Sequence, residues 1–245
     1  MAVKKITAPV TLQNTVHTCC PGCGHGLVYR IICEVIEEMG LNDKALWIQD
    51  VACGSIVSMQ FGYNKIMGAH GRVIPTACGA KRARPDMLVI GYAGDGATYS
   101  IGMQHTVHAA ARNEGFTMIC TNNTVYGMTG GQMSPESLIG QKTTSSPAGR
   151  DAVKQGNPIN VENLLSGMDI AYLARGAVDS VADINKTKGY IKKAFTKQMA
   201  GEGYTYVEVL SPCPTNWGLD AEKSIKFLQE NVMKQYPIGE FIDKK

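Results

Sequence analysis

Residues with oxygen donors follow two apolar stretches in the middle of the chain. Gly94-Asp95-Gly96 comes directly after residues 87–93, and Asn122-Asn123 comes directly after residues 116–121. Short apolar runs of this kind are typical of buried parallel strands, whose carboxyl ends meet at one edge of a sheet. Carboxylate and amide oxygens suit Mg²⁺, which commonly bridges phosphate oxygens to one or two protein side chains. The spacing predicts a metal-bound diphosphate, with Asp95, Asn123 and the Val125 carbonyl as metal ligands.

A simpler interpretation of Gly94-Asp95-Gly96 is a strand, a turn and a helix that Asp95 caps. Two turns with metal-ligating oxygens, each after an apolar run, favour the diphosphate site over a simple helix cap. The glycines would let the backbone approach the phosphates, and helix N-termini at such an edge offer amide donors. The predicted cofactor contacts are Gly94, Asp95, Gly96, Ala97, Asn123, Val125 and Tyr126.

Four of the eight cysteines form a second candidate site. Cys20 and Cys23 make a C-x2-C pair in a turn rich in Gly and Pro, a spacing that suits two thiolates on one metal centre. Cys53 follows a predicted strand, and Cys213 follows the last one, so both are expected at the ligand-binding edge. From spacing alone, a [4Fe-4S] cluster, an all-thiolate zinc, a redox disulfide and isolated core cysteines all remain open.

The other cysteines are weaker candidates. Cys33 falls within a predicted helix and Cys120 within a predicted strand, so both are expected to be small core residues. Cys19 competes with Cys20 as a ligand, although C-x3-C fits less well. Cys78 is expected in a glycine-flanked turn near the cofactor edge, where a local role stays open. His25 would hydrogen-bond a cluster sulfide or the diphosphate, or simply the backbone at a helix start.

The elements that must position these residues alternate between helix and strand. Helices are expected over residues 27–39, 98–113, 160–168, 184–200 and 220–234, and strands over 45–51, 87–93, 116–121, 170–174 and 204–210. Alternation of this kind predicts an α/β fold, a doubly wound and mostly parallel sheet with helices on both faces.

The length of 245 residues is consistent with one domain, predicted to cover 1–245. Within it we expect an irregular N-terminal arm over 1–18, a cysteine-bearing turn over 19–26 and a long active-site loop over 127–158. The first part of the loop, 126–132, is expected to wrap the cofactor. The remainder is expected to cover the site or meet a partner, with a surface excursion as the alternative.

Composition excludes several classes of protein. The net charge is +3 with no basic stripe, so nucleic acid is not expected as a partner. Eight cysteines without a secretion signal argue against a disulfide framework. The apolar runs are shorter than a membrane span and no signal-peptide segment is recognisable. These features predict a soluble cytoplasmic protein that does not bind membranes.

Taken together, the motifs resemble the thiamine-diphosphate-binding beta subunit of the 2-oxoacid:ferredoxin oxidoreductases, over nearly the whole chain. The resemblance rests on Cys20-Pro21-Gly22-Cys23-Gly24-His25, Ala52-Cys53-Gly54-Ser55, His70-Gly71-Arg72 with Pro75 and Lys81, Gly94-Asp95-Gly96, Asn122-Asn123 with residues 126–132, and Pro212-Cys213-Pro214-Thr215. It implies a thiamine diphosphate-binding fold. Cys78 is a departure from the pattern.

The resemblance also implies the cofactors. Cys20, Cys23, Cys53 and Cys213 would bind a [4Fe-4S] cluster, while Asp95, Asn123 and Val125 would bind Mg²⁺ beside thiamine diphosphate. Thr129 and Gln132 would contact or support that cofactor. The implied activity is coenzyme A-dependent oxidative decarboxylation of a 2-oxoacid to acyl-CoA and CO₂, with electrons passed to ferredoxin.

The family also implies partners. Alpha, gamma and ferredoxin-like delta subunits are expected, one of which would carry the glutamate that activates the cofactor, so the chain would hold half of an active site. His70, Arg72 and Lys81 would meet the substrate carboxylate or the cofactor, or else serve as surface charges. Branched-chain 2-oxoacids are the first expectation for the substrate and 2-oxoglutarate the second.

Two other functions remain as alternatives. One is a non-oxidative thiamine diphosphate-dependent lyase or carboligase with a structural zinc held by the four cysteines. The other is an iron-sulfur or zinc binding module without catalysis.

Overall fold

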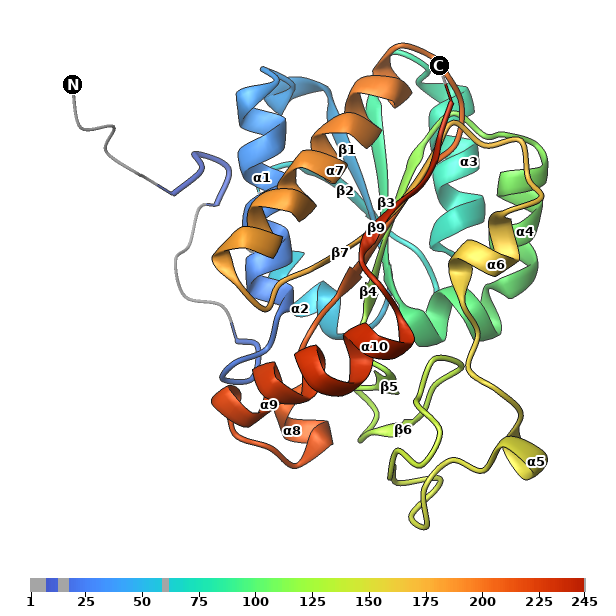
Figure 1. Cartoon of the computed structure of the whole chain (residues 1–245). Coiled ribbons are helices and arrows are strands. Elements are labelled where there is room, and N and C mark those ends of the chain that lie inside the picture. Colours follow the sequence, from blue (N-terminus) through green and yellow to red (C-terminus); the bar gives the residue numbers. More distant parts are fainter. Residues whose placement is uncertain (1–7, 13–17, 59–61, 245) are drawn as a thin grey trace.

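Seven strands form one sheet in the order β2-β1-β3-β4-β8-β7-β9 (Figure 1). The computed structural model describes residues 8–12, 18–58 and 62–244. The six strands from β2 to β7 in that order pair in parallel, and β9 runs antiparallel to β7. Their bounds are β1 Ala45–Gln49, β2 Asn64–Met67, β3 Leu88–Gly94, β4 Thr117–Asn122, β7 Tyr172–Ala177, β8 Thr205–Leu210 and β9 Gly239–Asp243.

Both faces of this sheet are covered, which explains why β3 reads as an unbroken apolar run. Leu88, Ile90 and Tyr92 of β3 join one core cluster, whereas Val89 and Ala93 join the other. Helices α1 (His25–Glu38) and α7 (Val181–Met199) cover the first face. Helices α3 (Val73–Ala83), α4 (Met103–Ala111) and α6 (Val161–Leu165) cover the second (Figure 1). The predicted fold class, a mostly parallel doubly wound sheet, is confirmed.

The sheet order places the candidate site residues side by side. Strands β1, β3, β4 and β8 are consecutive neighbours, and all run in the same direction. Their carboxyl ends lead to Cys53, Asp95, Asn123 and Cys213, respectively. Because parallel strands end at a common edge, four separate turns meet there.

The helix predicted over residues 98–113 is divided in the structure. A π-helical segment, η2 (Ala97–Ile101), is followed by α4 (Met103–Ala111), with Gly102 between them. A Cβ atom at position 102 would lie 2.4 Å from the Ala97 carbonyl oxygen, so the junction requires glycine. The prediction of one continuous helix was therefore wrong at its first turn.

Other predicted boundaries were displaced. The helix over 160–168 is only α6, which begins after its cap Asn160, and the strand over 170–174 is β7, shifted towards its carboxyl end. Residues 220–234 form a helical stretch capped by Asp220, made of α9 (Ala221–Phe227), η3 (Leu228–Val232) and α10 (Met233–Gln235). Apart from short elements in and beside the long loop, the elements that were not predicted are α2 (Cys53–Ser58), β2, α3, α8 (Pro214–Trp217), η1 (Asn42–Lys44) and β9.

Short elements lie within the loop over 127–158 and directly before it. Strands β5 (Val125–Tyr126) and β6 (Gln132–Met133) form a small antiparallel pair, and α5 (Ala152–Gln155) lies near the end. The buried Arg150 donates hydrogen bonds to five backbone carbonyls of the same loop, those of Ser134, Pro135, Ser137, Gly156 and Asn157. This guanidinium provides the donors that a regular ladder would otherwise supply.

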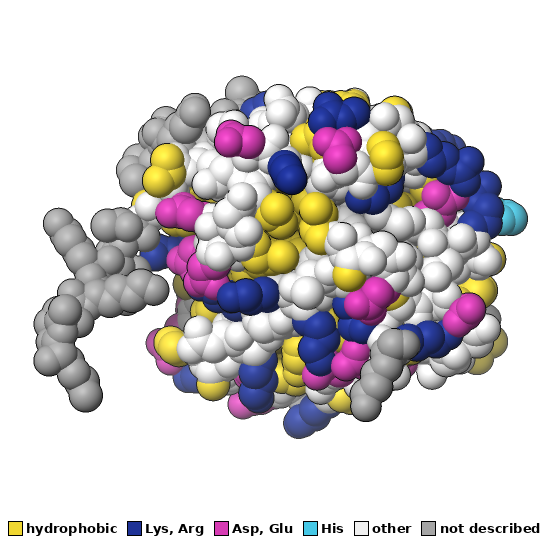
Figure 2. Space-filling view, turned by 90° about the horizontal axis from the view of Figure 1, so that it is seen from above, with side chains coloured by type: hydrophobic (Ala, Val, Ile, Leu, Met, Phe, Trp, Pro, Cys, Tyr) yellow, Lys and Arg dark blue, Asp and Glu magenta, His cyan; other side chains and the backbone are white. Residues whose placement is uncertain are grey.

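The N-terminal arm lies mostly outside the described residues, because positions 1–7 and 13–17 are not covered. In the part of the chain that the structure describes, no helix is long and apolar enough to cross a membrane. Figure 2 shows the end of the molecule opposite the β5–β6 pair, where acidic and basic side chains are interspersed. That mixture agrees with the small net charge of +3.

Candidate functional site

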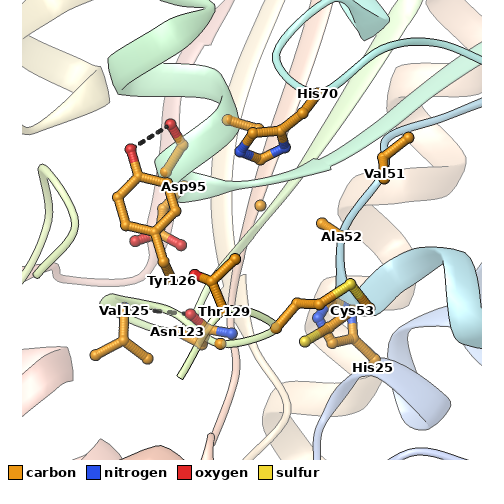
Figure 3. Close-up of a pocket in the computed structure, with 15 residues that line it drawn as sticks. His25, Val51, Ala52, Cys53, His70, Asp95, Asn123, Val125, Tyr126 and Thr129 are labelled. Atoms are coloured by element: carbon orange, nitrogen blue, oxygen red, sulfur yellow. Dashed lines mark hydrogen bonds between the residues drawn. The ribbon is translucent and has the colours of Figure 1, made fainter. Parts of the chain in front are cut away.

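A cavity of about 290 Å³ opens at the carboxyl edge of β3 and β4. It is lined by all nine residues predicted to contact the cofactor: His25, Gly94, Asp95, Gly96, Ala97, Asn123, Val125, Tyr126 and Thr129. In Figure 3, Asp95 and Tyr126 form one wall of this cavity, and Cys53 and His25 lie at its other end. We call it the first cavity. Its contact with a cofactor remains a prediction.

Asp95 is almost fully buried, with 1 % of its surface exposed. Ser134 Oγ donates a hydrogen bond to its Oδ2 at 2.5 Å. Burial raises the pKa of Asp95 to about 7, although the Ser134 hydrogen bond opposes the rise. A bound cation would favour the ionised carboxylate, so this residue fits the role of a metal ligand.

The turn after β4 is built by its own asparagines. Asn122 Oδ1 accepts a hydrogen bond from the Thr124 amide at 3.0 Å, and Asn123 Oδ1 accepts one from the Val125 amide at 3.3 Å. Thr124 has a φ of +62°, which a non-glycine residue rarely adopts. Backbone strain of this kind is concentrated at functional sites. The turn brings Asn123 and Val125 to the cavity wall together.

Gly96 is required by packing. A Cβ atom at position 96 would lie 2.2 Å from the Tyr126 ring, whose hydroxyl donates to the Gly96 carbonyl at 3.1 Å. Gly94 is different, because a Cβ there would meet only the Thr121 carbonyl oxygen, at 3.8 Å. The predicted reason for both glycines was close approach to phosphate. For Gly96, the aromatic ring is a sufficient reason.

A second cavity of about 350 Å³ lies beside the first. It is lined by the four cysteines predicted to bind metal, Cys20, Cys23, Cys53 and Cys213, and by Cys19. These thiols come from three places in the sequence: the turn before α1, the segment after β1 and the segment after β8. Cys33 and Cys120 are buried in the core as predicted.

Cys78 corrects one expectation. It lies within helix α3 and not in a glycine-flanked turn, and it packs in the core on the second face of the sheet. Cys78 is absent from the residues that line either cavity. A local role beside the cofactor edge is therefore not supported.

Thiolates such as those of the cysteine cavity can bind either a zinc ion or an iron-sulfur cluster. No group of three or more His, Cys, Asp or Glu side chains, among residues 8–12, 18–58 and 62–244, is arranged to hold a single metal ion. A zinc ion needs four ligands at about 2.0–2.3 Å, whereas a [4Fe-4S] cluster occupies the space between its cysteines. Burial and, to a smaller extent, the neighbouring Cys213 raise the pKa of Cys53 to about 12. A bound cationic centre would favour the thiolates.

Cys19 lies beside Cys23, one of the predicted ligands. A hydrogen bond with Cys19 lowers the pKa of Cys23 to about 7 and raises the pKa of Cys19 itself. The pairing favours Cys23 as thiolate and Cys19 as its donor.

The two cavities share a wall. His25, Cys53, Asn123, Gly127 and Met128 line both. A Cβ atom at Gly127 would lie 3.2 Å from Cys53 Sγ, so the chain passes directly over this thiol. The predicted metal–diphosphate site and the predicted cluster site are therefore adjacent.

His25 is held by a side chain and not by backbone alone. Its Nδ1 lies 2.7 Å from the Tyr92 hydroxyl, which also accepts a hydrogen bond from Thr121. Burial lowers the pKa of His25 to about 4, so the imidazole is neutral at pH 7. Because the Tyr92 hydrogen is free to point at Nδ1, this geometry favours Nε2 as the protonated nitrogen.

His70 lines the first cavity, but Arg72 and Lys81 do not. His70 Nδ1 lies 2.8 Å from Oδ2 of the buried Asp50, which the sequence analysis did not single out. Arg72 donates to the carbonyls of Gly71 and Ile101. Lys81 donates to the carbonyls of Pro85 and Met87, at the amino end of β3 and thus at the wrong edge. A substrate contact through Lys81 was therefore a wrong expectation.

Thr129 and Gln132 support each other at the mouth of the first cavity. Thr129 Oγ1 donates to Gln132 Oε1 at 2.6 Å, and Gln132 Nε2 donates to the Thr129 carbonyl at 2.9 Å. Only Thr129 lines the cavity. Gln132 fixes the conformation of the β5–β6 connection.

Several buried ionisable side chains lie near Asp95, and one of them, Glu208, acts on its pKa. Arg175 and Glu208 form an ion pair in which neither side chain is exposed, and Arg175 also pairs with Glu162. Glu136 is equally buried, and its carboxyl group lies beside that of Glu208, with which it forms a hydrogen bond when one of the two is protonated. Burial raises the pKa of Glu136 well above its usual range, and Glu208 and Asp95 raise it further. Its surroundings therefore favour the protonated carboxyl form of Glu136 more than water does.

Comparison with known proteins bears on these sites. Residues 48–209 match the family described as "Thiamine pyrophosphate enzyme, C-terminal TPP binding domain". The chain is 40 % identical over 226 residues to ketoisovalerate oxidoreductase subunit VorA of Methanothermobacter thermautotrophicus, covering 92 % of this chain and 47 % of that protein. The chain thus spans about half the length of this relative.

Two further relatives are similar over most of their length. The 2-oxoglutarate synthase subunit KorB of Methanocaldococcus jannaschii is 34 % identical over 221 residues, which cover 88 % of this chain and 78 % of that protein. The solved 2-oxoglutarate:ferredoxin oxidoreductase from Magnetococcus marinus, with 2-oxoglutarate, coenzyme A and succinyl-CoA bound, aligns with a TM-score of 0.77 at 25 % identity. That alignment covers 100 % of this chain and 87 % of the other.

Proposed function

This chain belongs to the 2-oxoacid:ferredoxin oxidoreductase family, and from that membership we propose that it is the beta subunit of such an enzyme. In this proposal residues 1–245 contribute one thiamine diphosphate-binding domain. The reaction is the coenzyme A-dependent oxidative decarboxylation of a 2-oxoacid to acyl-CoA and CO₂, with electrons delivered to ferredoxin. The observation that carries the proposal is the wall shared by the two cavities.

The first cavity would hold Mg²⁺ and thiamine diphosphate. Asp95, Asn123 and the Val125 carbonyl would supply the metal ligands, because they offer three hard oxygens at one cavity wall. Gly94, Gly96, Ala97, Tyr126, Thr129 and His25 would contact the cofactor. Neutral His25 would present a nitrogen donor without adding charge.

Cys20, Cys23, Cys53 and Cys213 would hold a [4Fe-4S] cluster in the second cavity. When bound, thiamine diphosphate supplies carbanion chemistry at a 2-oxoacid carbonyl and the cluster supplies one-electron transfer. The residues of this chain hold the two groups on either side of Cys53 and Gly127. That arrangement supports a short exit for electrons and favours this function over a lyase with a structural zinc.

Partner subunits are part of the proposal. No glutamate lines the first cavity among the residues that the structure describes, so the glutamate that activates the cofactor would come from another subunit. We propose alpha, gamma and ferredoxin-like delta partners, with ferredoxin as electron acceptor. The isolated chain is then expected to be inactive.

For the substrate, we propose 2-oxoisovalerate or another branched-chain 2-oxoacid first and 2-oxoglutarate second. Higher identity to the ketoisovalerate relative, 40 % against 34 %, supports this order. The decisive test is an anaerobic assay of the purified complex with a panel of 2-oxoacids, coenzyme A and a low-potential acceptor. Full turnover by this polypeptide alone would contradict the need for partners.

A binding experiment tests the metal site independently of activity. Asp95→Asn removes the carboxylate but keeps an acceptor for Ser134. We expect Mg²⁺-dependent binding of thiamine diphosphate to fall by at least a hundredfold in calorimetric titration. Asp86→Asn, on the surface, is the matched control and should bind like the parent. Metal analysis that finds stoichiometric zinc without iron would favour the lyase alternative.

A further inference from the structure

Helix α8 (Pro214–Trp217) follows Cys213 directly and contacts both sites. The Asn216 side chain donates from Nδ2 to the Gly127 carbonyl at 3.0 Å and to Cys213 Sγ at 3.4 Å. The Trp217 indole Nε1 donates to the Asn123 carbonyl at 3.0 Å. Two adjacent side chains thus hold the two ends of the segment from Asn123 to Gly127.

The segment that contacts Asn216 is fitted closely to it. Asn216 lines the cysteine cavity, and a Cβ atom at Gly131 would lie 2.9 Å from its Oδ1. The β5–β6 connection therefore bends around this amide on two sides, at Gly127 and at Gly131. Trp217 is anchored in turn, since its ring packs against Phe227 of α9 with 4.8 Å between centroids.

We propose that α8 couples the two sites: Asn216 sets the redox potential of the metal group held by Cys213, and Asn216 and Trp217 together hold the Asn123–Gly127 segment ready for the metal–diphosphate. This inference rests on the proposed function. It makes Asn216 and Trp217 positioning residues, because they act through Cys213, Gly127 and Asn123.

The chemistry of the amide supports both roles. An NH₂ group has two hydrogens, so Nδ2 can donate to Gly127 and to Cys213 at the same time. Reduction by one electron makes a thiolate-held cluster more negative, and hydrogen bonds to its sulfurs stabilise that negative charge.

The predicted effects separate the two residues. Asn216→Leu removes both side-chain bonds, so the cluster should be harder to reduce and the segment should be looser. Trp217→Phe removes only the bond to Asn123 and keeps the packing on Phe227. Asn216→Asp keeps the shape but replaces the donor with a carboxylate, which repels the thiolate and the Gly127 carbonyl.

The test uses the complete enzyme complex, reconstituted and measured anaerobically. The midpoint potential of the cluster is followed by electron paramagnetic resonance, and Mg²⁺-dependent binding of thiamine diphosphate by calorimetry. For Asn216→Leu we expect a tenfold shift of the reduction equilibrium, which is 59 mV to more negative potential for one electron, and about tenfold weaker cofactor binding. Asn216→Asp should shift the potential further.

Trp217→Phe should weaken cofactor binding without moving the potential. Asn163→Ala, an exposed asparagine on α6, is the matched control and should change neither quantity. If Asn216 had only a structural role, its substitution would lower the stability of the protein. The midpoint potential of the cluster would then not become progressively more negative from the parent to Asn216→Leu to Asn216→Asp.

Unchanged potential in Asn216→Leu at full iron content overturns the inference. If Asn216→Leu loses iron, the midpoint potential of Asn216→Asp at full iron content is the test instead. Loss of iron from both variants would overturn the potential-setting role, because Asn216 would then only help to retain the cluster. Failure of the proposed function is distinguishable, because the parent complex itself would then contain no cluster or bind no thiamine diphosphate.

Discussion

Ser134 Oγ lies 2.5 Å from Oδ2 of Asp95, although the two residues are 39 positions apart in the sequence. Asp95 directly follows strand β3, whereas Ser134 directly follows strand β6. The long loop is therefore part of the candidate site and not an excursion from it, at least as far as Ser134.

Ser134→Ala should weaken the metal–diphosphate site. The substitution removes the donor that orients Asp95, and loss of such a supporting contact commonly lowers metal affinity about 10–100-fold. We expect a change of about tenfold in the affinity for Mg²⁺ and thiamine diphosphate, measured by calorimetric titration. Ser166→Ala, on the surface after α6, is the control. Equal affinities for both variants would contradict a supporting role for Ser134.

Single cysteine substitutions should separate ligands from neighbours. Replacement of Cys20, Cys23, Cys53 or Cys213 by Ser should remove most of the bound iron and sulfide, since each supplies one thiolate to the proposed cluster. Cys19→Ser and Cys78→Ala should retain both. Iron and sulfide analysis with visible absorption of anaerobic protein provides the measurement. If Cys20→Ser retained iron and Cys19→Ser lost it, Cys19 and not Cys20 would be the ligand.

Glu136→Gln should change how stability depends on pH. The folded-state pKa of Glu136 lies above its unfolded value of 4.5, so its contribution is fully present below pH 4.5 and is lost as pH rises through the folded pKa. Relative to the variant, the cofactor-free parent should lose up to roughly 1.4 kcal/mol for each pH unit in that range.

Urea denaturation at intervals from pH 4.5 to 8.5 measures this difference. The comparison with Glu136→Gln cancels other groups, such as His25, whose lowered pKa gives the opposite slope. Parallel stability curves for parent and variant would show that Glu136 does not titrate above its usual range.

Arg175→Leu should be strongly destabilising. Arg175 is fully buried against Glu208, and removing one partner of a buried ion pair leaves an uncompensated charge that costs about 3–5 kcal/mol. Urea denaturation at pH 7 measures the loss. Arg84→Leu breaks an ion pair with Asp86 in which both side chains are more than half exposed, and it should be nearly neutral. A small effect of Arg175→Leu would contradict a stabilising role for this buried ion pair.

Most of the framework was predictable because burial leaves a strong pattern. Strands β3, β4 and β8 are buried and mostly apolar, so their ends, and with them Asp95, Asn123 and Cys213, were predicted at one edge of the sheet from the sequence. The exposed edge strand β2 has no such pattern, since all four of its residues are exposed. Within the sheet, β2 pairs with β1.

The supporting residues of the site were less predictable. Ser134 and Asn216 stand in irregular or very short segments, where no period marks them, and their partners are distant in sequence. Asp50 carried a usable signal, because it is a polar residue directly after an apolar strand, as Asp95 is. Lys81 was expected near the substrate, but it precedes β3 and therefore lies at the amino end of that strand, away from the cavity.

The sheet order has a consequence for how the protein is made. Strand β8 lies between β4 and β7, although it is synthesised after both. Until the ribosome has released residues 205–210, β7 has no route to the centre of the sheet and Cys213 is absent from its cavity. During this interval Cys20, Cys23 and Cys53 would be unprotected thiols on a nascent chain. Insertion of the proposed metal group would therefore be a late step of biogenesis, and oxidising conditions would damage the newly made chain more than the finished one.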